Sequence, residues 1–125
     1  VGEDWKREDF DALINYLNGF EHPLVNIQPI TPMPGTPLYD TYDGEITVPR
    51  EQYHLWDMAH VVFRPRFLSK RSYYYNILRA YIKTSANKKQ RKFIRERYGK
   101  RIYGRVKKGA AHIFMQYLGQ IIKPS

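Results

Sequence analysis

The chain has 125 residues, the length of one domain, and 42% of them are hydrophobic and 15% aromatic, which excludes intrinsic disorder. Its formal charge of +9 is unevenly placed: residues 1–63 hold 3 basic and 11 acidic side chains, and residues 64–125 hold 18 basic and one acidic. Because the chain has no cysteine, it holds no disulfide, thiolate zinc site, cysteine nucleophile or thiolate-ligated iron–sulfur cluster of its own.

The first residues show no sign of a membrane or export segment. No apolar run approaches the roughly 18 residues that span a bilayer, and Val1 to Trp5 has neither the basic nor the apolar region of a signal peptide. We therefore expect a soluble cytoplasmic protein. Because the chain starts without methionine and directly in a helical pattern, we also expect a piece of a longer protein.

A helix is the first predicted element. It is placed between Asp4, a suitable N-cap, and Gly19, a suitable helix end. Its apolar positions have the spacing of one helix face and are Phe10, Leu13, Ile14 and Leu17. After a break at His22-Pro23, apolar and polar side chains alternate from Leu24 to Ile30, which predicts a strand.

The middle of the chain is predicted to be rich in loops. Residues 31–37 carry three prolines and a glycine, which indicates a rigid loop. Residues 42–45 have turn composition, and residues 46–48 predict a short strand. Pro49 is suited to open a short helix that runs through Trp56 and Asp57, and residues 60–63 again read as extended.

The second half is predicted to be helical. Ser69 is a good N-cap for a helix, and a short basic helix is expected from Lys88 to Tyr98, ending at Gly99. The apolar face of the first of these helices is formed by Tyr74, Ile77, Leu78, Tyr81 and Ile82. The strongest helical pattern starts at Arg105 and stops before Pro124. Its apolar positions are Val106, Ala110, Ile113, Phe114, Tyr117, Leu118 and Ile121.

No self-contained active site is predicted. The four histidines are far apart, and none has a carboxylate at metal-ligand spacing such as H-E-x-x-H. The serines lack a G-x-S-x-G elbow. The acidic residues lie mainly at predicted helix ends and turns, where capping and helix-dipole roles explain them.

The basic segment from Lys88 to Lys108 holds 11 Lys or Arg and one Glu. Three interpretations stay open. In the first, it binds the phosphates of a nucleic acid, with Tyr98 and Tyr103, or residues 73–75, stacking on bases. In the second, it binds anionic lipid headgroups. In the third, it is a solvated surface, or a docking surface that faces an acidic partner, including the acidic half of the chain or another domain.

The proline-rich loop has a resemblance to a known family. A strand that ends in Pro-x-Pro-Gly-Thr-Pro exposes backbone groups at its carboxyl end, where α/β folds bind ligands, although a rigid connection without a ligand is the alternative. The run from Gln28 to Tyr39 resembles the end of the last barrel strand in radical S-adenosylmethionine enzymes, and the string P-x-P-G-T-P-L-Y resembles their cobalamin-binding branch. Trp56-Asp57 and His60 to Pro65 are similar to the segment that follows that barrel.

The resemblance implies an α-dominated α/β fragment. Phe10 to Leu17 and Val25 to Ile30 would be the last helix and strand of a partial (β/α)6 barrel. Residues 1–65 would form the end of the barrel and the segment after it, and residues 66–125 a basic helical C-terminal extension. The full-length enzyme would hold a 4Fe-4S cluster on a C-x-x-x-C-x-x-C loop and cleave S-adenosylmethionine to a 5′-deoxyadenosyl radical, with cobalamin as a further cofactor of that branch.

By the same resemblance, two groups of residues bind the cofactor. The backbone of Gln28, Pro29 and Ile30 would lie near the adenine of S-adenosylmethionine, and Pro34, Gly35 and Thr36 would shape the top of the barrel. The expected partners are the missing N-terminal domains of the same chain and further copies of it. The alternative function, from a different class, is a basic helical module that binds RNA or an anionic membrane surface.

Overall fold

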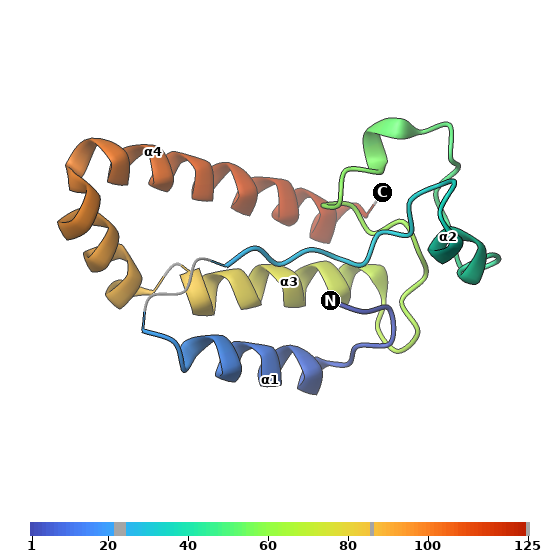
Figure 1. Ribbon diagram of the computed structural model, residues 1–125, viewed down its shortest axis with the longest axis horizontal. Coiled ribbons are helices and arrows are strands. Elements are labelled where there is room, and N and C mark those ends of the chain that lie inside the picture. The colour runs from blue at the N-terminus through green and yellow to red at the C-terminus, as the bar shows by residue number, and fades with distance from the viewer. Residues whose placement is uncertain (22–24, 86, 125) are drawn as a thin grey trace.

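The computed structural model describes residues 1–21, 25–85 and 87–124. Its three long helices, α1 (Arg7–Asn18), α3 (Lys70–Ser85) and α4 (Lys88–Ile122), lie side by side, and α3 packs against both others (Figure 1). A short helix α2 (Pro37–Thr41) and a 3-10 turn η1 (Tyr53–Leu55) lie at the end where α3 begins. None of the helices in these ranges is long and apolar enough to cross a membrane.

The predicted α/β fold is wrong, because the described residues contain no strand, sheet or barrel. Residues 25–30 run extended beside α3 (Figure 1), but their backbone does not pair with a neighbouring strand. Instead, the Ile27 N–H donates to the Tyr81 hydroxyl at 2.8 Å, and that hydroxyl lies 2.9 Å from the Ile27 carbonyl oxygen. A side chain of α3 therefore takes the backbone groups that a sheet would use. The predicted break at His22-Pro23 and the first position of the run, Leu24, lie outside the described residues.

The short extended segments predicted after the proline-rich loop meet at one point. An antiparallel bridge joins Ile46 to Phe63, and the Thr47 N–H donates to the Val62 carbonyl at 2.8 Å. The helix predicted from Pro49 through Asp57 is reduced to the three residues of η1. A single bridge is too short for a strand, because both segments turn away after one pair of residues.

Helix α1 begins at Arg7, so the prediction of Asp4 as its N-cap is wrong. The Lys6 N–H donates to the Asp9 carboxylate at 2.7 Å, which satisfies one of the free amides of the first turn. The predicted end at Gly19 is confirmed. Phe10 and Ile14 of the predicted apolar face are buried, and the other two residues of that face are half-buried.

The core is built around aromatic side chains from both sides of residue 65. Tyr73 is fully buried and packs edge-on against Phe10 and Phe63, with ring centroids 5.6 Å apart in each pair. Trp5 covers Phe10 from the other side, with the ring centroids at 5.1 Å. These contacts hold α1, α3 and the extended segment at residues 61–63 in one core.

Helix α3 is fixed at its start and at its middle. Ser69 is its N-cap as predicted, since its hydroxyl accepts the Ser72 N–H at 3.1 Å. Further along, the buried Arg79 guanidinium donates to the Asp11 carboxylate at 2.6 Å and to the Asn76 side chain at 3.0 Å. The hydrogen bond from Arg79 lowers the pKa of the Asp11 carboxyl. This link ties α3 to α1.

Helix α4 is interrupted at Gly99, as the sequence predicts. Gly99 has φ 85° and ψ 170°, a non-helical conformation within an otherwise helical run. The second part of α4 resumes directly after Gly99 rather than at Arg105. The change of direction at Gly99 turns the second part of α4 back along α3 (Figure 1).

We expect Gly99→Ala to lower the free energy of unfolding by about 1–3 kcal/mol, because this backbone region is open essentially to glycine alone. Urea unfolding followed by circular dichroism measures it. Gly104→Ala is the control: Gly104 lies in the helical part of α4 with no atom within 4 Å of an added Cβ, so alanine there should stabilise by about 0.5–1 kcal/mol. If both variants were stabilised, Gly99 would not have the non-helical backbone conformation that forms the bend.

Few side chains of α4 are buried, namely Gln90 in its first turn and Tyr117 near its end. Tyr117 is buried and packs near Tyr74 and Tyr81, with ring centroids 6.1 Å away in each case. Val106, Ile113 and Phe114, which belong to the same predicted apolar face, remain 44%, 41% and 39% exposed. The first part of this face therefore diverges from α3 and leaves apolar side chains uncovered.

Candidate functional site

The first predicted group, Gln28 to Ile30, is held by the start of the chain. The Val1 nitrogen donates to the Gln28 carbonyl at 2.7 Å, and the Ile30 N–H donates to the Val1 carbonyl at 2.8 Å. Two parallel extended segments bond in this way, here over a single residue of one partner. Pro29 is buried, and its carbonyl accepts the Thr31 hydroxyl at 3.1 Å. The backbone predicted to meet an adenine is thus engaged by Val1.

The second predicted group, Pro34 to Thr36, forms the turn that starts α2. The Thr36 hydroxyl accepts the Tyr39 N–H at 3.3 Å and donates to the Met33 carbonyl at 2.6 Å. Gly35 has φ +87°, and an added Cβ would meet nothing within 4 Å. The glycine therefore serves the turn and not a close approach within the chain. In the described residues, no hydrogen bond joins Pro34–Thr36 to Gln28–Ile30.

A cavity of about 400 Å³ lies beside the first group, between α1 and residues 25–28. Gln28 is the one predicted site residue in its lining. Leu13 and Leu17 of α1 form one wall, which explains why half of the predicted α1 face is not buried. The cavity follows the edge of residues 25–28 on the side where Val1 makes its hydrogen bonds.

Tyrosine hydroxyls anchor the loops around these residues, a role that the sequence did not reveal. The Tyr42 hydroxyl donates to Glu3 at 2.7 Å, and the Tyr74 hydroxyl accepts the Val61 N–H at 2.7 Å. Tyr73 and Tyr74 are fully buried, so the prediction that residues 73–75 stack on bases is wrong for these two. Apolar periodicity marked Tyr74 and Tyr81 as core residues, but hydroxyl partners leave no periodic signal.

The buried tyrosines predict a loss of stability at alkaline pH. Burial raises the pKa of Tyr42 to about 12, helped by the Glu3 carboxylate, and burial raises the pKa of Tyr74 to about 12. Folding favours the protonated phenols, so this stabilisation is complete below pH 10 and is lost as pH rises from about 10 to 12. Urea unfolding at stepped pH, with tyrosinate absorbance read in parallel, measures the loss. In Tyr42→Phe the decline should be shallower, and a flat stability up to pH 12 would contradict the prediction.

A histidine–aspartate pair lies after η1. His60 Nδ1 is 2.9 Å from the Asp57 carboxylate, which also accepts the backbone N–H groups of Ala59 and His60 at 2.9 Å each. Partial burial raises the pKa of Asp57, but these hydrogen bonds outweigh it, so the net pKa is lowered. Asp57 thereby fixes the turn at Met58, which has a φ of 63°. The pair closes a turn, and the described part of the chain holds no group of three or more His, Asp or Glu able to hold a metal.

The basic segment lies on α4 with all eleven of its Lys and Arg side chains exposed. In the part of the chain that the structure describes, the ion pair made by this segment is Lys92 to Glu96, at 4.0 Å within α4. The acidic half pairs elsewhere, for example Asp11 with Arg79 and Glu45 with Arg66. The interpretation that the acidic half covers this segment therefore finds no support among the described residues.

Apolar side chains are exposed on the same helix. Ile102, Val106 and Ile113 lie on one line of α4, at spacings of four and seven residues, and are 46%, 44% and 41% exposed. Tyr98 is 51% exposed and Tyr103 lies in a cavity against α3, so these two tyrosines do not form one stacking surface. The helix therefore presents cations together with an apolar ridge.

Comparison with known proteins assigns no family to this chain. No family model, no curated protein and no solved structure matches it. Its function has to be inferred from the arrangement of its own residues.

Proposed function

We propose that this chain is a segment of a radical S-adenosylmethionine enzyme, with a proline-rich loop on the substrate side and helices that cap the enzyme. The observation that carries the proposal is the run from Gln28 to Tyr39. Its string P-x-P-G-T-P-L-Y resembles that family, and in this fold the string forms a defined loop, with a positive φ at Gly35 and an N-cap at Thr36. The loop follows directly on an extended segment.

The surroundings of that segment support the proposal. Val1 and residues 28–30 bond as parallel extended segments do, and α1 lies between them in the chain. A cavity of about 400 Å³ lies beside residues 25–28 and gives room for further chain. These features suit a segment that pairs with other parts of a larger enzyme.

The iron–sulfur cluster of such an enzyme does not fit the residues present. The chain has no cysteine, and the described residues hold no cluster of other metal-ligating side chains. The backbone groups nearest to the expected adenine position are engaged by Val1. The cluster, S-adenosylmethionine and any cobalamin would be held mainly by residues outside these 125.

The first test is the coding sequence upstream of Val1. We expect a C-x-x-x-C-x-x-C motif within about 250 residues, the usual length of a complete barrel of this kind. The extended product, prepared without oxygen and reconstituted with iron and sulfide, should release 5′-deoxyadenosine from S-adenosylmethionine in the presence of dithionite. An upstream sequence without the motif would overturn the proposal.

A matched pair of glycine variants tests the role of this loop in the extended product. Gly35 and Gly44 are both exposed, have φ of +87° and +83°, and would each place a Cβ in open space. Alanine should therefore strain both turns equally, by about 1–2 kcal/mol. We expect only Gly35→Ala to lower 5′-deoxyadenosine formation, by about tenfold or more. Equal rates for both variants would count against a site at this loop.

A second candidate function rests on the exposed face of α4, which suits binding to an anionic membrane surface. Its eleven exposed cations supply the attraction to acidic headgroups, at about 1 kcal/mol for each residue close to the surface. The exposed ridge of Ile102, Val106 and Ile113 gives the helix apolar side chains to insert at the headgroup boundary. RNA would leave that ridge in water, and the buried Tyr73 and Tyr74 are not available for stacking.

Vesicle flotation tests this second candidate. We expect the chain to float with vesicles of 30% phosphatidylserine in phosphatidylcholine at 0.05 M salt, less at 0.3 M, and not with phosphatidylcholine alone. A single-stranded RNA oligonucleotide in filter binding provides the comparison. Retention of RNA at 0.15 M salt without vesicle binding would overturn the membrane candidate.

A further inference from the structure

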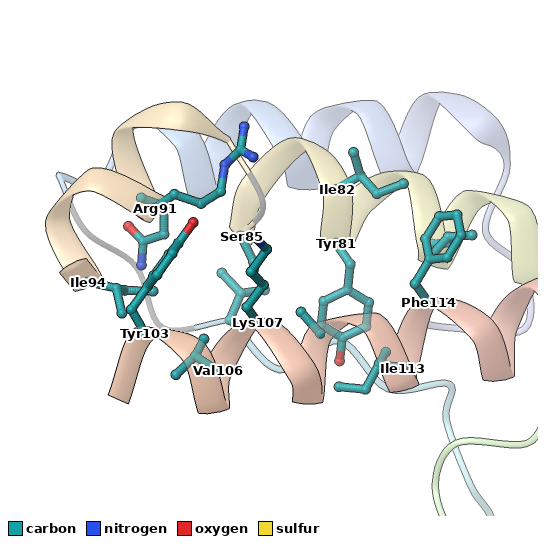
Figure 2. A pocket seen from close by; sticks show the side chains of 14 residues that line it. Tyr81, Ile82, Ser85, Arg91, Ile94, Tyr103, Val106, Lys107, Ile113 and Phe114 are labelled. Atoms are coloured by element: carbon teal, nitrogen blue, oxygen red, sulfur yellow. The ribbon is translucent and has the colours of Figure 1, made fainter. Parts of the chain in front are cut away.

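A cavity of about 410 Å³ lies between parts of α3 and α4. One wall is formed by Leu78, Tyr81 and Ile82 of α3, and the other by side chains from both parts of α4, on either side of Gly99 (Figure 2). Most of the lining is apolar, including Ile94, Val106, Ile113 and Phe114. The bend at Gly99 creates this space, because it brings the two parts of α4 to the same side of α3.

Three polar side chains in the lining favour an anionic ligand. Arg91 and Lys107, from the two parts of α4, line the cavity with their cationic side chains, and no Asp or Glu is part of the lining. Ser85, at the end of α3, lies near them (Figure 2). Its hydroxyl oxygen is buried and has no hydrogen-bond partner among the described residues. A buried hydroxyl without a partner is costly, and the two cations in the same lining favour an anionic acceptor.

We propose that this cavity binds a long-chain fatty acid, with the carboxylate at Arg91, Lys107 and Ser85 and the alkyl chain between α3 and the second part of α4. The volume lies within the range of about 300–1,000 Å³ that is usual for small-molecule sites. A second copy of the chain would bring its own excess of cations to the basic rim.

Binding of cis-parinaric acid, followed by its fluorescence and by displacement with oleate, tests the proposal on the 125-residue chain. We expect oleate to bind with a micromolar Kd and oleyl alcohol, which lacks the charge, at least tenfold more weakly. Arg91→Gln and Lys107→Gln should each raise the Kd for oleate by about tenfold. Equal affinity for oleate and oleyl alcohol would overturn the assignment of the headgroup site.

Two neighbouring alanines on α4 provide a test and a matched control for the position of the alkyl chain. Ala110 lines the cavity, whereas Ala111 does not, and both are exposed. Ala110→Phe should fill the cavity and abolish oleate binding, whereas Ala111→Phe should bind normally, with both variants showing the same helical circular dichroism. Equal oleate binding by both variants overturns the proposal.

Light scattering after gel filtration tests whether a second copy of the chain fills the cavity. If the chain without fatty acid is a dimer that Ala110→Phe makes monomeric, a second copy fills the cavity and the proposal is wrong. Vesicle flotation of Ala110→Phe distinguishes a failure of the fatty-acid proposal from a failure of the membrane candidate. Val106 and Ile113 line the cavity and also belong to the apolar ridge of the membrane candidate, but Ala110→Phe removes none of the exposed cations, so flotation should persist in this variant.

Discussion

Neutralising four cations of α4 should weaken binding to anionic vesicles by about 1,000-fold. Each Lys or Arg near an acidic membrane contributes about 1 kcal/mol, and 1.4 kcal/mol corresponds to a factor of ten. The four side chains are all exposed and none makes an ion pair within the described residues. The residues to change to glutamine are Lys100, Arg101, Arg105 and Lys108. Vesicle titration at 0.05 M salt measures the loss.

The control removes the same net charge elsewhere. Four exposed basic residues outside the segment from Lys88 to Lys108 are suitable, namely Arg50, Arg64, Lys83 and Lys123. Their replacement by glutamine also lowers the formal charge from +9 to +5. We expect this variant to lose less than tenfold. Equal losses for both variants would show that net charge, and not the surface of α4, governs binding.

Phe10→Ala should lower the free energy of unfolding by about 3–5 kcal/mol, the usual cost of removing a buried phenylalanine. Phe10 is fully buried, and its ring meets Trp5 and Tyr73 edge-on, at 5.1 and 5.6 Å between centroids. Small domains are stable by only about 5–15 kcal/mol, so the variant should unfold at a much lower urea concentration. Urea unfolding with tryptophan fluorescence measures the shift.

Phe20→Ala is the matched control for that substitution. Phe20 follows α1, is 51% exposed and meets Tyr16 at the surface, with ring centroids at 5.2 Å. We expect a loss of about 1 kcal/mol or less. A comparable loss in the two variants would mean that α1 does not pack on α3 through Phe10.

Local signals predicted the helices well. The periodic apolar face of α1, the cap at Ser69 and the glycine at position 99 each depend on a few neighbouring residues, and each is found in the structure. The predicted cap at Asp4 is wrong because the helix begins at Arg7, where the Asp9 carboxylate accepts the N–H of Lys6. Helix α2 was missed because Pro37, at its first position, belongs to the run that predicts the rigid loop.

The strand at residues 25–30 failed for a different reason. Alternation of apolar and polar side chains describes an extended backbone, which the structure has, but a strand also needs a second backbone along its length, and the Val1 backbone meets only Gln28 and Ile30. Here the hydroxyl of Tyr81, which lies 54 residues away in the sequence, takes the backbone groups of Ile27. No local pattern records such a partner.

By itself, the sequence determined the three long helices, where α4 bends and that the basic charge gathers in one segment. These properties depend on backbone preferences and side-chain charges within a few residues. Only the tertiary structure decided that Tyr73 is a core residue, that Gln28 and Ile30 are bound by Val1, and that α4 leaves a cavity at Arg91 and Lys107. Burial and cavities depend on which distant surfaces meet, and the bend at Gly99 sets that meeting for α3 and α4.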